Sequence, residues 1–370
     1  MRSATDARRG DAGTPRLAWP DAVRLLATAA IFLFHFFPEF LRLSGTQGGG
    51  FERIVGKSFN DWGLSAFVVL SGFSLTLSCL TAARPYRDYA ARRLVRLYAP
   101  YWTVAVPITA LGFAMGVAGL DELWKVPIWL LGLGVVSEST YLPISNAWWF
   151  VSLALQISLL APLVVWVYRR YGAFVATLGM LAVQAATLGV IYFAGRGWQY
   201  LDQGFVLARL AEVVAGVLAA CILVKRRDGG SIRAELGGLA ALLVAVPFLY
   251  SIPHYHFIPW DAPFVLALVF AACALWAPAG GRQVRWLAVA AAYTYCFYLC
   301  HAPVTKYTLE ALFGRGVSGL AATFVLSLAA SVVVTWVAES ASRRYTTRLV
   351  RALVYALLRV RPARATRAGG

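Results

Sequence analysis

Apolar residues are gathered into long runs along most of this chain, and short polar segments separate one run from the next. The runs are 17 to 24 residues long, which at 1.5 Å per residue suffices to cross a bilayer core of roughly 30 Å. They lie at residues 18–38, 62–83, 97–118, 147–168, 172–195, 203–224, 236–252, 262–279, 286–305 and 316–338. The pattern therefore predicts an all-α, polytopic bundle of about ten transmembrane helices.

The basic residues indicate which runs cross and in which direction. A further apolar run, from Trp124 to Val136, is short and contains Pro127. If it does not cross, one side of the membrane holds both termini and all Lys and Arg except Arg42, Arg53, Lys57, Lys125, Arg196, Arg209, Lys306 and Arg315. The positive-inside rule therefore favours ten spans with both termini cytoplasmic, and an interfacial or re-entrant segment at 124–136 on the outer side.

The composition agrees with this pattern and removes several classes of protein. Sixty per cent of the residues are apolar and 14% are charged, whereas soluble chains carry about a quarter charged residues. In a soluble chain the net charge of +17 would suggest a nucleic-acid partner. Here the basic residues lie mostly between apolar runs, so they indicate topology, and no nucleic acid is expected. The bias toward arginine and alanine is typical of GC-rich bacterial genomes, and we expect an inner (plasma) membrane protein.

The two ends of the chain are polar and basic, which divides the sequence into three expected segments. These are a cytoplasmic tail at 1–17, a transmembrane domain at 18–340 and a second basic tail at 341–370. In the second tail, Arg344, Arg348 and Arg351 share one face of a helix, and leucines occupy another. Two interpretations stay open: an amphipathic helix on the inner leaflet, or a solvated basic tail.

Ionisable residues inside a membrane span are costly and therefore mark candidate functional sites. In the first run, Arg24 lies near the expected inner end and His35 near the outer end, about 16 Å apart along a helix. Asp21 precedes Arg24 by one helical turn and can pair with it. Considered alone, Arg24 could as well be an interfacial anchor as a site residue. A single buried histidine is more often a hydrogen-bonded core residue than a catalytic one. His301 lies at the same outer level, and two histidines at one depth favour a site.

A second candidate is the basic segment that follows the second run. Arg92, Arg93 and Arg96 have i,i+3 and i,i+4 spacings, so on a helix they form a compact patch suited to phosphate oxygens. Cytoplasmic loops of membrane proteins are basic in any case. Charge alone therefore favours a role in membrane topology as strongly as a role in phosphate binding.

Other polar positions have structural interpretations. Arg209 and Glu212 lie one turn apart inside a run, and we expect a structural ion pair. The small residues in Ser71-Gly72-Phe73 provide a point where helices can approach closely. His254 and His256 have no third ligand nearby, so no metal site is predicted.

These residues resemble the acyltransferase-3 family of integral membrane acyltransferases, from Trp19 to Ser340. The matching segments are Asp21–Leu26, the pair Arg24 and His35 with ten residues between them, Val69–Phe73, Arg93–Trp102 with its RxxR motif, and Thr294–Pro303. Each segment alone is a weak signal. Five in the right order, each at the expected topological position, make the resemblance specific.

The resemblance implies transfer of a short acyl group, acetyl favoured, from a cytoplasmic acyl-CoA to a hydroxyl of a carbohydrate or other glycosylated acceptor. Acyl-CoA is then a donor substrate, and no tightly bound cofactor is expected. His35 would act as general base, with Arg24 near the thioester and His301 as partner, second acid/base or acceptor-binding group. Direct attack and a covalent acyl-histidine relay both stay open. The remaining candidates are Arg92, Arg93, Arg96 and Tyr98 for CoA, and Asp21, Ser71, Gly72, Phe73, Trp149 and Tyr298 for substrate or structure.

Two departures from the family pattern leave alternatives open. Many members carry a glutamate in the segment aligned with Trp149–Pro162, which here has no acid, and the late Glu-x-Pro pattern appears as Glu339-Ser340-Ala341. One rival function is a transporter or flippase of a lipid-linked or small polar substrate, which would need no acyl-CoA. Another is a non-catalytic partner in polysaccharide assembly. The oligomeric state is left open by the sequence.

Overall fold

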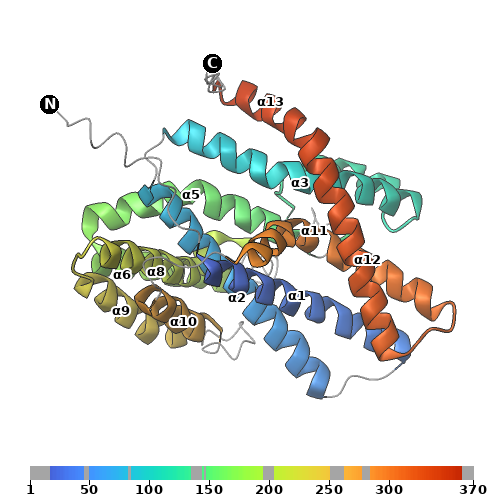
Figure 1. The fold of residues 1–370 in the computed structure, drawn as a ribbon, viewed down its shortest axis with the longest axis horizontal. Coiled ribbons are helices and arrows are strands. Elements are labelled where there is room, and N and C mark those ends of the chain that lie inside the picture. Colours follow the sequence, from blue (N-terminus) through green and yellow to red (C-terminus); the bar gives the residue numbers. More distant parts are fainter. Residues whose placement is uncertain are drawn as a thin grey trace.

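The computed structural model describes residues 17–45, 50–81, 85–134, 144–145, 147–194, 204–250, 262–276 and 284–360, and the described part contains helices and no strand. The helices are α1 Ala18–Ser44, α2 Gly50–Thr81, α3 Tyr86–Ala114, α4 Val126–Leu130, α5 Trp149–Tyr171, α6 Ala173–Ala194, α8 Leu210–Arg227, α9 Arg233–Tyr250, α10 Ala262–Trp276, α11 Arg285–Phe313, α12 Leu320–Ala341 and α13 Thr347–Leu357. Two 3-10 turns, η1 Leu120–Lys125 and η4 Val206–Arg209, and a π-helical segment, η5 Ser342–Thr346, complete the set (Figure 1). The predicted all-α class is confirmed.

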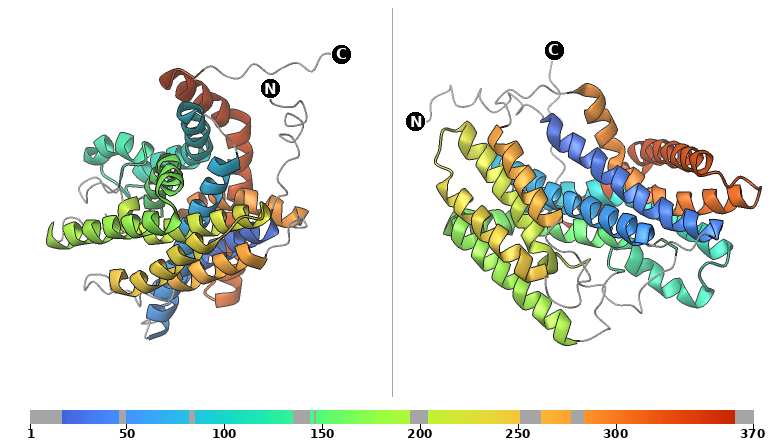
Figure 2. Two further views of the ribbon diagram at one scale, coloured as in Figure 1. Left: turned by 90° about the vertical axis from the view of Figure 1, so that its left-hand side faces the viewer. Right: turned by 90° about the horizontal axis from the view of Figure 1, so that it is seen from below.

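The described helices include 8 that are long and apolar enough to cross a membrane. They fall on eight of the ten apolar runs, and the other two runs form α9 and α10, which are shorter. Figure 2 shows the long helices aligned side by side, as in a membrane bundle. The short run that begins at Trp124 forms the end of η1 and the five residues of α4, so it is too short to cross as a helix.

The surface of the bundle is apolar, as expected for a protein surrounded by lipid. Phe193, Phe248 and Trp276 are 85%, 73% and 77% exposed on the outer faces of α6, α9 and α10. Exposed apolar side chains also cover much of α12. Because water would penalise so large an apolar surface, the chain is a multi-pass membrane protein.

Helix α8 occupies the centre of the bundle, and its contact with α2 depends on two glycines. A Cβ atom on Gly72 would lie 2.4 Å from the carbonyl oxygen of Val213, and a Cβ on Gly216 would lie 2.1 Å from that of Val69. Both distances are far below van der Waals contact, so each glycine lets the two backbones touch. The close approach predicted at Ser71-Gly72-Phe73 is therefore present.

The C-terminal helix α13 continues α12 through the π-helical segment and lies along α3 (Figure 1). Val350 and Val354 are buried against Ala91, Val95 and Ala99 of α3. The leucines of its amphipathic pattern stay exposed: Leu349, Leu353 and Leu357. The helix thus has one face on the bundle and a second, apolar face directed outward.

Candidate active site

Two histidines from helices far apart in sequence meet inside the bundle. His35 of α1 and His301 of α11 have ring centroids 5.0 Å apart, with their planes at 64°. Helices α1 and α11 pack together and run in the same direction. Arg24 and Ala291, early in the two helices, line one cavity, and His35 and His301, ten or more residues later, contact each other. The sequence predicts that the two histidines lie at the same depth, and in the fold they are in contact.

The hydrogen bonds of His301 determine which of its ring nitrogens is available for chemistry. Its Nδ1 atom lies 2.7 Å from the carbonyl oxygen of Tyr298 and 3.1 Å from that of Phe297. A carbonyl only accepts, so Nδ1 carries the proton and Nε2 of the neutral ring keeps a lone pair. Within the described residues, Nε2 is buried without a hydrogen-bond partner. His301 is 1% exposed, whereas His35 is only partly buried.

Aromatic rings pack against both histidines. Phe297 stacks on His301 at 5.7 Å with an interplanar angle of 6°, and the ring of Phe34 lies 4.8 Å from that of His35. Tyr298 lies 5.7 Å from His301, and its hydroxyl donates a hydrogen bond to the carbonyl oxygen of Ala147. The pair thus lies in a confined, largely apolar setting.

A cavity of about 430 Å³, here called the central cavity, extends from Tyr298 toward the N-terminal end of α1. Its polar lining consists of Arg24, Ser71, Ser74, Arg93, Arg96, Ser158, Thr294, Tyr295, Tyr298, Glu339 and Arg343. Arg24 is fixed by an ion pair with Asp21 at 3.3 Å, as the one-turn spacing predicted. The two histidines do not line this cavity; Tyr298 does, and it contacts His301. Tyr298 therefore stands between the cavity and the histidines.

Of four other sequence candidates, three lie around this cavity without lining it, and one lines it. Phe73 packs on Trp19 at 4.8 Å and on Phe270 at 6.1 Å, so it supports the wall. Gly72 contacts α8, as described above. Trp149 packs on Phe150 at 6.2 Å, and Phe150 itself lines the cavity. Ser71 is the member of this group that reaches the cavity.

The basic segment on α3 divides between two cavities. Arg93 lines the central cavity and lies over the ring of Tyr89 at 5.5 Å. Arg92 lines a second cavity, of about 540 Å³, and Arg96 lines both. Tyr98 lines neither; its hydroxyl donates to the carbonyl oxygen of Leu131 at 2.8 Å. The structure therefore separates Tyr98 from the three arginines with which it was grouped.

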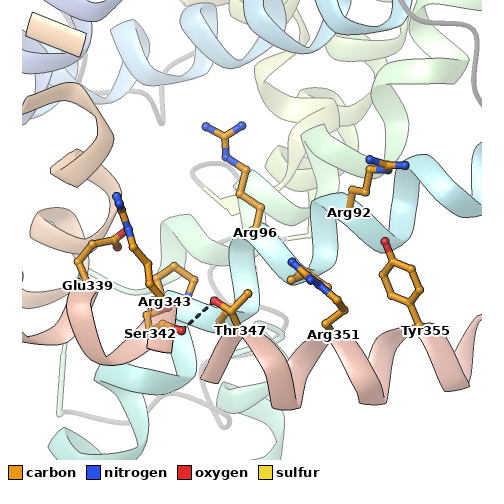
Figure 3. A pocket seen from close by; sticks show the side chains of 11 residues that line it. Arg92, Arg96, Glu339, Ser342, Arg343, Thr347, Arg351 and Tyr355 are labelled. Atoms are coloured by element: carbon orange, nitrogen blue, oxygen red, sulfur yellow. Dashed lines mark hydrogen bonds and ion pairs between the residues drawn. The ribbon is translucent and has the colours of Figure 1, made fainter. Parts of the chain in front are cut away.

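The second cavity lies between α3, the π-helical segment and α13, and is here called the α3–α13 cavity (Figure 3). The two cavities share four lining residues: Arg96, Pro100, Glu339 and Arg343. Arg343 donates to Glu339 at 2.7 Å. The sequence did not identify Arg343, Arg351 and Tyr355 as lining residues. Arg351 belongs to the basic face predicted for the C-terminal helix, and that face could have indicated an anion site.

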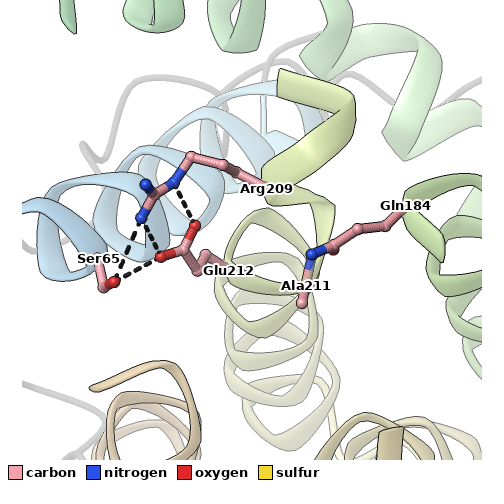
Figure 4. A network of polar contacts seen from close by, with 5 residues as sticks. All are labelled: Ser65, Gln184, Arg209, Ala211 and Glu212. Carbon is pink, nitrogen blue, oxygen red and sulfur yellow. Dashed lines mark hydrogen bonds and ion pairs between the residues drawn. The ribbon is translucent and has the colours of Figure 1, made fainter. Parts of the chain in front are cut away.

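The expected ion pair inside the bundle is present and belongs to a network (Figure 4). Arg209 donates to both carboxylate oxygens of Glu212, at 2.5 and 2.7 Å, and Ser65 of α2 donates to the same carboxylate at 2.5 Å. Next to it, Gln184 of α6 accepts a hydrogen bond from the backbone of Ala211 at 2.6 Å. The buried charges are satisfied by one another, so the network is structural.

The segment Trp149–Pro162, in which many family members carry a glutamate, contains the neutral amide of Gln156 here. This side chain makes a pair of hydrogen bonds that a carboxylate could not make. Gln156 donates through Nε2 to the carbonyl oxygen of Gly204 at 2.7 Å, and its Oε1 accepts from the backbone of Val206 at 3.1 Å. A glutamate at this position would lack the donor. Gln156 therefore ties α5 to the start of the η4 turn. His254 and His256 lie outside the described residues.

Comparison with known protein families finds a match that covers most of the chain. A family model described as an acyltransferase domain matches residues 17–339, which span α1 to the end of α12. No curated protein and no solved structure matches the chain. The matched range contains both histidines, Arg24 and the basic segment of α3.

Proposed function

The chain belongs to the acyltransferase-3 family, and on that premise we propose that this membrane acyltransferase moves a short acyl group from cytoplasmic acyl-CoA to a hydroxyl group. The acceptor we propose is a carbohydrate or another glycosylated molecule, and the favoured acyl group is acetyl. The observation that carries the proposal is the His35–His301 pair, 5.0 Å apart, which Tyr298 connects to a cavity lined by arginines.

The donor would enter through the basic end of the central cavity. Arg93 and Arg96 would bind the phosphates of CoA, because guanidinium groups form charge-assisted hydrogen bonds to phosphate oxygens. Arg24, held by Asp21, would steady the pantetheine arm or the thioester. His35 lies three helical turns beyond Arg24, about 16 Å along α1, so an extended arm places phosphates and thioester at opposite ends of the site.

Tyr298 is the barrier that the thioester would have to pass. It lines the central cavity, contacts His301 and is hydrogen-bonded to Ala147. Its neighbours at the cavity wall, Phe67 and Phe150, lie 6.3 and 5.3 Å away. We propose that these rings separate the donor side from the acceptor side until both substrates are bound, which would limit loss of the acyl group to water.

In the reaction, His35 would accept the proton of the acceptor hydroxyl as its oxygen attacks the thioester carbonyl carbon. The carbon–oxygen bond forms, the carbon–sulfur bond breaks, and the thiolate of CoA leaves and takes up the proton. The products are an ester and free CoA thiol. His301, whose Nε2 keeps a lone pair, would accept a hydrogen bond from the acceptor or from protonated His35.

The rival function, a transporter or flippase, would use the same intramembrane charges but would leave acyl-CoA intact. The family assignment favours transfer chemistry over transport. The test is release of CoA thiol by purified protein in lipid bilayers that contain no acceptor, with a panel of short acyl-CoAs. We expect slow release that is selective for one acyl chain.

Binding provides the second arm of this test, since a strict enzyme without its acceptor releases no thiol. We then expect the preferred acyl-CoA to raise the melting temperature of the protein, and Arg93→Gln to abolish that shift. Absence of both thiol release and acyl-CoA binding would contradict the proposal and support the transporter.

A further inference from the structure

The C-terminal helix builds one wall of a cavity that borders the central cavity. Arg351 and Tyr355 of α13 line the α3–α13 cavity opposite Arg92 and Arg96 of α3 (Figure 3). Both residues follow residue 339, the last one matched by the family model. Family membership therefore assigns no role to this wall.

The position of α13 is fixed by packing and by a polar contact. Val350 and Val354 are buried against α3 on either side of Arg351 in the sequence. The hydroxyl groups of Thr103 and Thr346 lie 2.8 Å apart and join α3 to the π-helical segment. A π-helical segment is rare and is often found at functional sites. Here the segment directly precedes α13, whose Arg351 lines the cavity.

The charge of this cavity is suited to an anion. Four arginines line it, and the single carboxylate, that of Glu339, is paired with Arg343 at 2.7 Å. In the described part of the chain, Arg92 and Arg351 make no ion pair, although they approach from facing helices. Facing guanidinium groups repel each other, so a bound phosphate would stabilise the arrangement.

The location of the cavity identifies the phosphate. Arg96, Pro100, Glu339 and Arg343 border both cavities, so the two cavities adjoin, and a long donor in the central cavity would extend toward the α3–α13 cavity. The α3–α13 cavity lies at the basic end, remote from the histidines. In a donor whose thioester points to His35, the group farthest from the thioester is the phosphorylated adenosine.

We infer that Arg351, together with Arg92, binds the 3′-phosphate of the donor's adenosine, and that the ring of Tyr355 forms part of the nucleoside pocket. This inference rests on the proposed function, since it takes acyl-CoA as the donor. It extends the donor site to a helix outside the matched family domain and makes the C-terminal helix a determinant of donor specificity.

The test compares the affinity of CoA with that of 3′-dephospho-CoA in the full-length protein, held in nanodiscs of neutral phosphatidylcholine. We expect wild type to bind CoA about tenfold or more tightly, the effect of a charge-assisted hydrogen bond. In Arg351→Gln the two affinities become nearly equal, because CoA binding weakens and 3′-dephospho-CoA binding does not. Arg351→Lys retains part of the preference.

Arg348→Gln is the matched control, because it removes the same charge from the same helix and Arg348 does not line the cavity. It keeps the wild-type preference for CoA. An unchanged melting temperature in the absence of ligand shows that each variant is folded.

Three results would overturn the inference, and they separate it from the proposed function. If wild type binds CoA but does not distinguish it from 3′-dephospho-CoA, or if Arg351→Gln keeps the distinction, the inference falls and the proposed function stands. If wild type binds neither nucleotide and releases no thiol from any acyl-CoA, both fall. If phosphatidylglycerol stabilises wild type but not Arg351→Gln and competes with CoA, the cavity holds a lipid headgroup instead.

Discussion

The imidazole rings of His35 and His301 lie 5.0 Å apart, although the two residues belong to α1 and α11 and are far apart in the sequence. The two rings differ in their surroundings. His301 is buried and donates through Nδ1 to two backbone carbonyls, whereas His35 is partly accessible. The arrangement gives His301 a fixed orientation and leaves the ring of His35 more accessible than that of His301.

The role of His301 can be separated from its contribution to the fold. In His301→Asn the side-chain amide can replace the Nδ1 donor to the carbonyls of Phe297 and Tyr298, but the Nε2 lone pair is lost. We expect a folded protein whose turnover falls by about 10²-fold, a typical contribution of one acid/base group. Turnover and melting temperature are measured on the same sample. Wild-type turnover would show that His301 has only a structural role.

Arg24 is expected to contribute to donor binding. Its guanidinium lies in the central cavity beside Asp21, so Arg24→Gln removes a positive charge from the path of the donor. The KM for acyl-CoA should rise by about tenfold or more, the effect of one charge-assisted hydrogen bond. Arg42→Gln, at the other end of the same helix and outside the cavity, is the matched control. Equal effects of the two variants would contradict a specific role for Arg24.

The contact between α2 and α8 should not tolerate a methyl group. Gly216→Ala would place its Cβ 2.1 Å from the carbonyl oxygen of Val69, so the two helices would have to separate. Overpacking of this kind costs about 1–3 kcal/mol or more, and we expect a lower melting temperature and a lower yield of folded protein. Gly179→Ala is the control, since that helical glycine of α6 has open space around it. A Gly216→Ala protein as stable as Gly179→Ala would disprove the close contact.

The stability of the protein should depend on the buried ion pair between Arg209 and Glu212. Glu212→Gln leaves Arg209 as an uncompensated cation inside the bundle, and breaking such a pair costs about 3–5 kcal/mol. In comparison, Glu310→Gln removes a partner of the exposed Arg42, and exposed pairs contribute about 0–1 kcal/mol. Thermal unfolding of the two variants in identical lipid should therefore differ clearly. Similar melting temperatures would mean that lipid or water compensates Arg209.

Much of the architecture could be predicted from the sequence because hydropathy, charge and short spacings act locally. Ten apolar runs became helices, the Asp21–Arg24 and Arg209–Glu212 pairs follow one-turn spacings, and the run from Trp124 does not form a spanning helix. The roles of the site residues stay predictions, although the meeting of His35 with His301 places two of them together.

What could not be predicted depends on how helices rotate and pack. The rotation of α3 separates Tyr98 from Arg92 and Arg96, because Tyr98 faces the Leu131 carbonyl rather than a cavity. Of the three arginines on the basic face of the C-terminal helix, only Arg351 lines the α3–α13 cavity, because the packing of this helix on α3 sets which side of it faces the cavity. Neither rotation is encoded in hydropathy, and both are set by tertiary contacts such as that of Val350 with α3.

The most direct test of the account is thiol release from the preferred acyl-CoA by His35→Ala beside wild type, each in lipid bilayers. Since His35 is the proposed base, we expect release to fall by about 10²-fold to 10⁴-fold while CoA still raises the melting temperature of the variant as it does that of wild type. Wild-type release by a folded His35→Ala protein that binds CoA would contradict the mechanism.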